Sequence, residues 1–251
     1  AALVATVCIA FAIWVGRGLS DFDLSEHRQM DLTFTFNEAE LSGTLILPKD
    51  VTAPPTALPI ALIIHGDGPQ DRFSNGGYLP LINTMVDAGI GVFTWDKAGV
   101  GASTGNWLDQ SMEDRANEAL AAFRAVSSLD GMEADRIGFL GFSQAGWVLP
   151  RVATRMEPAF TVIIGGAVSW RDQGTYFKRV ELRSEGLLSD EIEQRLAERR
   201  RENDRIFGAV PDPSLVPDMS PDRFDFVARA YWEDSTENIA TMKGPVLAIW
   251  G

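Results

Sequence analysis

A serine at residue 143 stands in a segment whose composition suits nucleophilic chemistry, residues 136–146. An apolar run bounded by charge and glycine predicts a short buried strand that ends in Gly-x-Ser. Small residues follow, and then an apolar, helix-compatible segment from Trp147 to Val152. A serine at such a sharp strand-to-helix turn presents its hydroxyl at the carboxyl end of a sheet, and the strained turn needs a small neighbour such as Gly141. We therefore interpret Ser143 as a nucleophile.

The backbone after Ser143 offers a second part of the same chemistry. The N–H of Gln144 would lie at the N-terminus of the following helix, where it can stabilise a developing oxyanion. Ala145 stands where the stricter Gly-x-Ser-x-Gly pattern has glycine, so the motif taken alone also fits a chance match. The elements that surround this segment must decide between the two interpretations.

A second candidate segment follows the apolar run Ile60 to Ile64, which predicts a strand buried on both faces of a parallel sheet. The residues after it are His65-Gly66-Asp67-Gly68-Pro69-Gln70-Asp71-Arg72. Here bare backbone N–H groups could face a ligand, and Asp67 matters for its N–H more than for its carboxylate. We expect His65 to shape the loop through hydrogen bonds, because a histidine beside glycines at a strand end does so more often than it acts as a base.

A third segment follows the predicted strand Ile90 to Trp95 and is the glycine-rich turn from Asp96 to Ser103. A phosphate site is disfavoured, since no Gly-Lys-Ser/Thr ending and no closely following helix are present. Ligands of open parallel sheets bind beyond the carboxyl ends of the strands. Three such ends carry His65-Gly66-Asp67, the Asp96 turn and Ser143, and this convergence favours the functional interpretation of Ser143.

The elements that must position these segments alternate along the chain. Residues 31–36 and 41–47 predict a β-hairpin, with a proline-rich connector at 51–59. Residues 79–88 predict a helix ended by Gly89, and Ser111 with Asp114 three residues on predicts the start of another that runs until Gly131. A further buried strand is expected at residues 160–164. Strands and helices in this order imply a mostly parallel, doubly covered sheet of the α/β class.

Residues 169–243 differ from the rest of the chain in their dense charge and predict a helical insertion, most simply a lid. We expect Ser189 to cap a helix that runs to about Phe207, and Ser220-Pro221 to open another. The basic residues of the first helix could meet an anionic substrate, but interleaved glutamates favour a solvated face: Arg195, Arg199, Arg200, Arg201 and Arg205. The aromatic residues of the insertion could line a pocket or pack against the core: Trp170, Tyr176, Phe177, Tyr231 and Trp232. Residues 245–250 predict one more buried strand.

Composition limits the partners and the location of the protein. The formal net charge of -13 makes a nucleic-acid backbone an unsuitable partner. The single cysteine, Cys8, excludes an intrachain disulfide, and the low histidine count and the lack of a Cys/His cluster suggest no metal site. Residues 1–16 carry no charge and predict a signal peptide or a membrane anchor, with a buried helix as the alternative. We therefore expect a secreted, periplasmic or membrane-anchored protein with a possible membrane tether through residues 1–16.

These motifs together resemble the α/β-hydrolase superfamily, in particular its bacterial esterase and serine-aminopeptidase-like branch with a helical cap. The resemblance covers about residues 30–251 and depends on the 141–145 elbow, the 65–72 loop, the 96–103 turn and the spacing of residues 245–251. It implies an α/β-hydrolase core at 21–168 and 244–251 and a cap at 169–243, and the apolar residues before the core give a signal or anchor remnant at 1–20. It also implies that Ser143 is the nucleophile, that the Gln144 and Asp67 N–H groups form the oxyanion hole, and that no cofactor is needed. His65, Gly66, Gly141 and Asp96 would shape the site.

The catalytic base and acid are the point at which the sequence departs from that family. The family order is serine, then an acid, then histidine, whereas His27 and His65 both precede Ser143. The resemblance therefore places the acid and the histidine beyond Gly251, together with a final strand and helix segment. We expect residues 1–251 alone to be nearly inactive, because a serine without a base is a poor nucleophile.

The leading functional hypothesis is a serine hydrolase of carboxylic esters. A serine exopeptidase or a thioesterase of the same fold is the alternative, so the substrate would be a small-molecule ester, thioester or peptide. The hypothesis from another class is a non-catalytic, membrane-tethered binding protein that kept the pocket and lost the triad.

Overall fold

The computed structural model describes residues 20–51 and 58–250. These residues form two compact units, the first within residues 1–105 and 121–140 and the second within 106–120 and 141–251. The predicted signal or anchor segment, residues 1–16, lies outside the described residues, as does most of the proline-rich connector. No helix in the described parts of the chain is long and apolar enough to cross a membrane.

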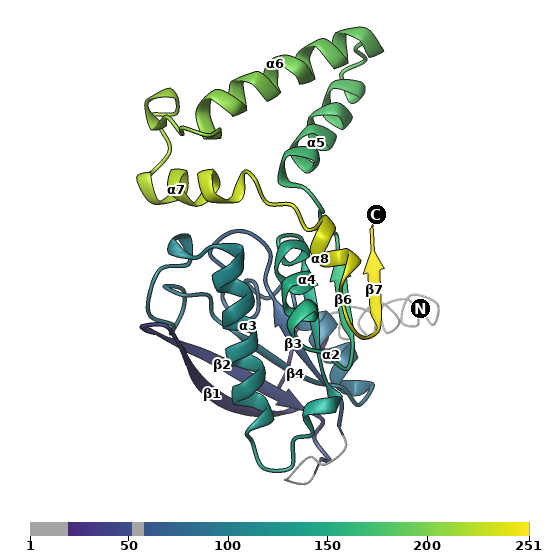
Figure 1. The fold of residues 1–251 in the computed structure, drawn as a ribbon. Helices are drawn as coiled ribbons and strands as arrows, with labels where there is room; N and C mark the ends of the chain where they lie inside the picture. The colour runs from purple at the N-terminus through teal and green to yellow at the C-terminus, as the bar shows by residue number, and fades with distance from the viewer. Residues whose placement is uncertain (1–19, 52–57, 251) are drawn as a thin grey trace, which may run out of the picture. The chain divides into compact units, whose positions relative to one another are not determined.

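Seven strands form one sheet in the order β1-β2-β4-β3-β5-β6-β7 (Figure 1). The first two are antiparallel, β2 pairs antiparallel with β4, and the pairs β3/β4 and β6/β7 are parallel. The strands are β1 (Arg28–Phe36), β2 (Ala39–Leu47), β3 (Ile60–Ile64), β4 (Gly91–Trp95), β5 (Ile137–Phe142), β6 (Thr161–Ile164) and β7 (Val246–Ile249). This mostly parallel sheet with an N-terminal hairpin confirms the predicted fold class.

The core of the first unit follows from continuous apolar runs. Every residue of β3 and β4 is buried, as a strand covered on both faces requires. The helix α2 (Leu79–Asp87) ends before Gly89, whose φ of +84° is one that glycine adopts without strain. The predicted hairpin is confirmed, and its two strands are longer than the alternating pattern indicated.

The start of α3 (Met112–Ser127) is set by a reciprocal cap. The Asp114 carboxylate accepts hydrogen bonds from the N–H and the hydroxyl of Ser111, at 2.9 and 2.6 Å, and the Asp114 N–H donates to the Ser111 hydroxyl at 3.1 Å. These bonds satisfy donors that a helix N-terminus otherwise leaves unpaired. The predicted N-terminus is therefore confirmed, while the helix ends at Ser127, before the predicted Gly131.

The segment 169–243 is helical, as predicted, and holds α5 (Trp170–Ser184), α6 (Ser189–Phe207), α7 (Pro221–Ala230) and α8 (Thr236–Ala240) (Figure 1). Leu182 of α5 packs against Ile192 and Leu196 of α6 in a small apolar cluster. Ser220 caps α7 by accepting a hydrogen bond from the Arg223 N–H. The prediction that Ser189 caps α6 is wrong: Ser189 is the first helical residue, and Leu188, which has no side-chain acceptor, occupies the cap position.

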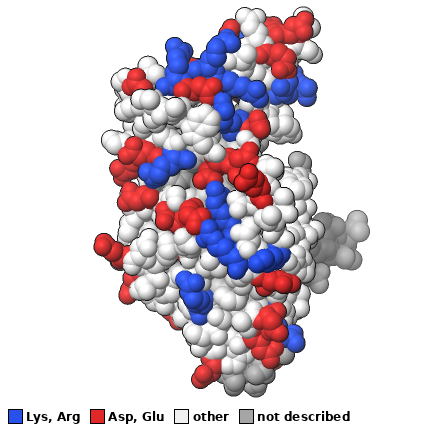
Figure 2. Space-filling view, viewed as in Figure 1, with Lys and Arg blue, Asp and Glu red and all other residues white. Residues whose placement is uncertain are grey.

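The charged residues of α6 form a solvated face. Arg195 pairs with Glu191 one turn earlier at 3.0 Å, and Arg179 of α5 pairs with Glu193. Figure 2 shows lysine and arginine side chains interleaved with aspartate and glutamate over this segment. The exposed charges of α6 confirm the expectation of a solvated face, and the Arg195–Glu191 pair is of the i,i+4 kind that stabilises an exposed helix.

The last strand differs from its prediction. Residues 245–250 were expected to form a buried strand, but β7 is largely exposed, with Leu247 55% accessible. The reason is its position: β7 is the final strand in the sheet order, and among the described strands it pairs with β6. An apolar run alone does not distinguish a central strand from an edge strand.

Candidate active site

Ser143 occupies the turn between β5 and α4 (Ala145–Arg155) in the second unit. Its φ of +49° is a left-handed conformation that a residue with a Cβ rarely adopts. The turn is held because the Ser143 N–H donates to the carbonyl of Ile164 at 2.9 Å, and the Ser143 carbonyl accepts from the Gly146 N–H at 2.9 Å. The residue is exposed while Gln144 beside it is buried. This strained, exposed serine is what the sequence predicted.

The small residues around Ser143 are required by close packing. A Cβ added to Gly141 would lie 2.4 Å from the Cβ of Ala145 and 2.8 Å from the Leu149 side chain. A Cβ at Gly146 would lie 2.9 Å from the Cα of Gly166. The first turn of α4 therefore packs directly against β5 and against the loop after β6. Alanine fits at residue 145, so the departure from the stricter motif leaves the turn intact.

A buried arginine that was not predicted as a site residue anchors Gln144, the residue after Ser143. The Gln144 side-chain oxygen accepts a hydrogen bond from the Arg115 guanidinium, and both residues are almost fully buried. The sequence did contain a signal, because Arg115 lies three residues after Met112 and four before Ala119 and so falls on the apolar face of α3. A charged residue on such a face needs a buried partner.

A cavity of about 560 Å³ lies at the carboxyl ends of β6 and β7 in the same unit. It begins at Gly165, directly after Ile164, the residue that holds the Ser143 N–H. Its lining is largely apolar but includes two carboxylates and no lysine or arginine: Gly165, Gly166, Ala167, Val168, Ser169, Asp172, Gln173, Tyr176, Phe177, Asp234, Thr236 and Trp250. Its volume lies within the range of small-molecule sites.

The aromatic residues of the insertion therefore divide between the two expectations. Tyr176 and Phe177 line the cavity. Trp170 instead packs on Trp147 of α4, with ring centroids 5.1 Å apart, and Tyr231 is buried against Phe207.

In the first unit, His65 shapes its loop as expected. Its imidazole is buried, and its Nε2–H donates to the carbonyl of Trp95 at 2.6 Å. The ring stacks on Tyr78 with centroids 5.6 Å apart. His27, the other histidine, lies in the same unit and makes a 2.8 Å hydrogen bond with the side-chain oxygen of Asn83. Both histidines thus have structural roles within the first unit.

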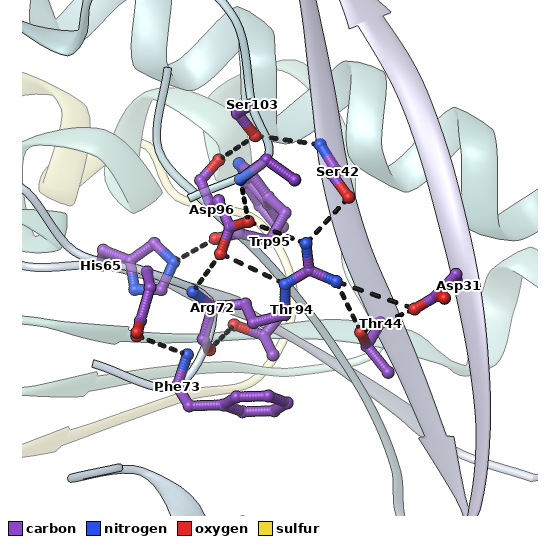
Figure 3. Close-up of polar contacts among 12 residues, drawn as sticks. Asp31, Ser42, Thr44, His65, Arg72, Phe73, Thr94, Trp95, Asp96 and Ser103 are labelled. Atoms are coloured by element: carbon purple, nitrogen blue, oxygen red, sulfur yellow. Dashed lines mark hydrogen bonds and ion pairs between the residues drawn. The ribbon is translucent and has the colours of Figure 1, made fainter. Parts of the chain in front are cut away.

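Asp96, at the start of the third predicted segment, forms an ion pair with Arg72, the last residue of the 65–72 loop, which was not predicted as a site residue (Figure 3). Its carboxylate accepts 2.7 Å hydrogen bonds from the N–H and the Nη2 of Arg72, and a 2.9 Å bond from the Ala102 N–H. The guanidinium also donates to the hydroxyls of Ser42 and Thr44 on β2, each at 2.8 Å. The 65–72 loop, the 96–103 turn and the hairpin are thereby joined.

The ionisation of this pair follows from its contacts. Burial by itself would raise the pKa of Asp96, but the hydrogen bonds from Arg72 and Ala102 outweigh it and hold that pKa below its ordinary value. The hydrogen bond to Asp96 likewise raises the pKa of Arg72. Asp96 is therefore a structural carboxylate at neutral pH, and its charge holds the loop geometry.

The predicted residues thus fall into two groups. Ser143, Gln144 and Gly141 meet in one turn of the second unit, and His65, Gly66, Asp67 and Asp96 lie in two linked loops of the first unit. Within the described residues, no group of three or more His, Cys, Asp or Glu side chains could hold a metal ion.

Comparison with known proteins identifies the fold to which this structure belongs. No family model and no curated protein matches the sequence. The structure is similar to an esterase from Pyrococcus furiosus, with a TM-score of 0.59, 18% identity, and coverage of 90% of this chain and 71% of that one. It is also similar to Est1E from Butyrivibrio proteoclasticus, solved with ferulic acid bound, with a TM-score of 0.55, 18% identity, and coverage of 86% of this chain and 77% of that one. A third similar structure is proline iminopeptidase from Mycobacterium smegmatis, with a TM-score of 0.54, 18% identity, and coverage of 87% of this chain and 80% of that one.

The chain has the α/β-hydrolase fold. This is the fold that the resemblance implied, and it accounts for the strained turn at Ser143, since a serine in a strand-to-helix turn of this form is typical of such sheets. The chain spans 71% to 80% of the lengths of these three proteins and 53% of another α/β hydrolase. At these identities the comparisons establish the fold, and function must be argued from the residues of the site.

Proposed function

We propose that the protein is a serine hydrolase that acts on carboxylic esters through an acyl-enzyme at Ser143. The observation that carries the proposal is the left-handed, exposed serine between β5 and α4, with φ +49°. Backbone strain of this kind persists where the surrounding structure imposes it, and it is common at active sites. The packing of Gly141 and Gly146, which have no room for side chains, supports the same conclusion.

The proposed reaction has two acyl-transfer steps. The Ser143 oxygen attacks the ester carbonyl, and the carbonyl electrons move to an oxyanion that the Gln144 N–H stabilises. The intermediate then collapses, the C–O bond to the alcohol breaks, and the alcohol leaves with the serine proton. Water hydrolyses the acyl-enzyme by the same sequence and restores the serine hydroxyl. The Asp67 N–H, expected as the second donor, remains a prediction.

The base that moves the proton is not assigned to either histidine of this sequence. His65 uses its Nε2–H on the Trp95 carbonyl, and His27 is engaged with Asn83. The resemblance places the acid and the histidine after residue 251, so activity is to be measured on the full-length gene product. The predicted secreted, periplasmic or membrane-anchored location remains a prediction as well.

A serine exopeptidase is the second candidate, and one observation favours it. Asp172 and Asp234 line the cavity that begins at Gly165, and carboxylates there would attract a substrate with a free ammonium group. Esters remain the first choice because an ester is cleaved more readily than an amide by the same nucleophile.

The test is a comparison of wild type with Ser143→Ala in the full-length protein. We expect wild type to hydrolyse p-nitrophenyl butyrate and to be labelled by a fluorophosphonate probe, and Ser143→Ala to lose both. Ser184→Ala, a change at the exposed end of α5, is the matched control and should keep both. Hydrolysis that survives in Ser143→Ala would refute the assignment of the nucleophile. A folded wild-type protein that neither hydrolyses esters or peptides nor accepts the probe would favour the binding-protein hypothesis.

A further inference from the structure

Ser235 is a buried serine of the second unit whose hydroxyl does not make the contact that its place in the chain predicts. It occupies the N-cap position of α8, where a serine side chain ordinarily accepts a hydrogen bond from a helix N–H, but it makes no such cap. The residue is 0% accessible, and its hydroxyl donates instead to the carbonyl of Gly146 on α4, 89 positions earlier in the chain, at 2.9 Å. The hydroxyl therefore serves a tertiary contact in place of a local one.

Gly146 belongs to the turn that holds Ser143. Its N–H donates to the Ser143 carbonyl at 2.9 Å. The residue is also closely packed, because a Cβ added to it would lie 2.9 Å from the carbonyl oxygen of Ala167. The hydrogen bond from the Ser235 hydroxyl to Gly146 therefore fixes the position of residue 235 relative to Ser143.

The other contacts of Ser235 reach the wall of the cavity at the carboxyl ends of β6 and β7. The preceding residue, Asp234, lines this cavity, and the Ser235 N–H donates at 2.9 Å to the carbonyl of Val168, which lines it too. The same carbonyl accepts a 2.8 Å hydrogen bond from the indole N–H of Trp147 on α4. Two parts of the cavity wall are thereby attached to the first turn of α4.

These two parts of the wall lie where the chain enters and leaves the helical insertion 169–243. An antiparallel bridge between Ser169 and Asp234 joins them, so a shift of one part moves the other. A displacement of about 1 Å can cost a reaction about 100-fold in rate when it moves the bound substrate away from its reactive geometry. A substrate too small to touch the wall would not be affected by such a shift.

We propose that Ser235 is a positioning residue that sets the cavity wall at Val168 and Asp234 relative to Ser143 and so determines how large substrate groups are held. This inference rests on the proposed function, because it takes Ser143 as the nucleophile and the cavity as the place of the larger substrate group. Ser235 contacts neither the substrate nor the reacting atoms in this role. Its loss is therefore expected to matter in proportion to the size of the substrate.

The test is Ser235→Ala in the full-length protein, which removes the hydroxyl and little else. Two pairs of esters cover the two ways of filling the cavity: p-nitrophenyl acetate and p-nitrophenyl 4-phenylbutyrate differ in the acyl group, and ethyl acetate and 4-phenylbutyl acetate differ in the alcohol. For the larger ester of one pair we expect kcat/KM to fall about 5-fold to 20-fold, while both smaller esters stay within about two-fold of wild type. Trp147→Phe, which removes the indole donor to Val168, should change the same pair in the same direction.

Thr154→Ala is the matched control. The Thr154 hydroxyl also donates to a carbonyl on α4, that of Arg151, at 2.8 Å, and Thr154 does not line the cavity. We expect this variant to keep the ratio of kcat/KM within each pair of esters, even where its Tm falls. A purely structural role of Ser235 would instead lower Tm and reduce kcat/KM for all four esters by one common factor.

The outcomes separate the two proposals. If Ser143→Ala abolishes hydrolysis but Ser235→Ala keeps both ratios within about two-fold of wild type, the role of Ser235 is refuted and the proposed function stands. An equal change of the ratio in Thr154→Ala also refutes it. If Ser235→Ala does not fold, Trp147→Phe is judged by the same two ratios. If wild type shows no hydrolysis dependent on Ser143, the proposed function fails and this inference fails with it.

Discussion

The methyl group of Ala145 fills the space that a side chain at Gly141 would need. A Cβ at residue 141 would lie 2.4 Å from the Ala145 Cβ, a separation that real Cβ atoms do not reach. One methyl group therefore fits between the end of β5 and the first turn of α4, and this chain carries it at residue 145. The position of Ser143 depends on that contact, because the serine lies in the turn between the two residues.

Gly141→Ala is expected to destabilise the protein and to displace Ser143. Overpacking of a tight contact costs about 1–3 kcal/mol, so the urea midpoint should fall and kcat should fall with it. The double variant Gly141→Ala, Ala145→Gly moves the methyl group to the other side of the contact and should recover much of the stability, to be measured as a double-mutant cycle. Additive effects of the two changes would show that the residues do not share this space.

Asp96→Asn is expected to cost about 3–5 kcal/mol in the free energy of unfolding, because it leaves the half-buried guanidinium of Arg72 without its buried counter-charge. The side chains of Arg72 and Asp96 are 15% and 4% accessible. Asp31→Asn is the matched control, since Asp31 approaches the same guanidinium at 3.7 Å but its side chain is 90% accessible. Exposed ion pairs contribute about 0–1 kcal/mol to stability, so Asp31→Asn should lose much less than Asp96→Asn. Equal losses in the two variants would contradict the assignment of Asp96 as the main partner of Arg72.

The lowered pKa of Asp96 predicts a specific dependence of stability on pH. An unfolded aspartate titrates at about 3.9, and the folded carboxyl titrates below its usual range because of Arg72 and Ala102. The stabilisation is complete above the unfolded value and is lost as the pH falls through the folded one. In urea unfolding between pH 7 and pH 3, the difference between wild type and Asp96→Asn should shrink at the acidic end. A difference that stays constant would argue against this linkage.

The cavity at the carboxyl ends of β6 and β7, which we propose receives the substrate, predicts a preference for substrate charge. Hydrogen bonds from Thr236 lower the pKa of Asp234, so this carboxylate is ionised at neutral pH. Asp172 also lines the cavity, with an arginine, Arg200, 3.7 Å away on α6. An ester with a trimethylammonium group should therefore have a higher kcat/KM than a carboxylate ester of equal size, by about 3-fold to 10-fold at low salt.

Asp172→Asn combined with Asp234→Asn should remove most of that preference. Asp190→Asn, an exposed acidic residue at the start of α6 outside the cavity, should retain it. The measurement is the ratio of kcat/KM for the two esters in each variant. An equal rate for both esters in wild type would show that the carboxylates do not face the substrate.

The sequence by itself determined the order of elements, the fold class and the sharp turn in which Ser143 lies, while the role of Ser143 as a nucleophile remains a prediction. Buried strands, glycine turns and helix caps are local patterns, and the Ser111–Asp114 cap and the Ser143 turn follow from residues adjacent in the chain. It also indicated that His65 shapes its loop. The predicted cap of α6 was wrong by one residue, because only the backbone geometry shows that Leu188 is the cap and Ser189 the first helical residue.

Tertiary structure decided what depends on partners distant in the sequence. The pairing of Arg72 with Asp96, of Arg115 with Gln144 and of Lys97 with two glycine carbonyls joins residues 24 to 31 positions apart, and no local pattern specifies such contacts. The exposure of β7 depends on its place in the sheet, which an apolar run does not reveal. Local residues set the backbone turn at Ser143, while long-range burial and hydrogen bonding set the contacts that hold the loops within each unit.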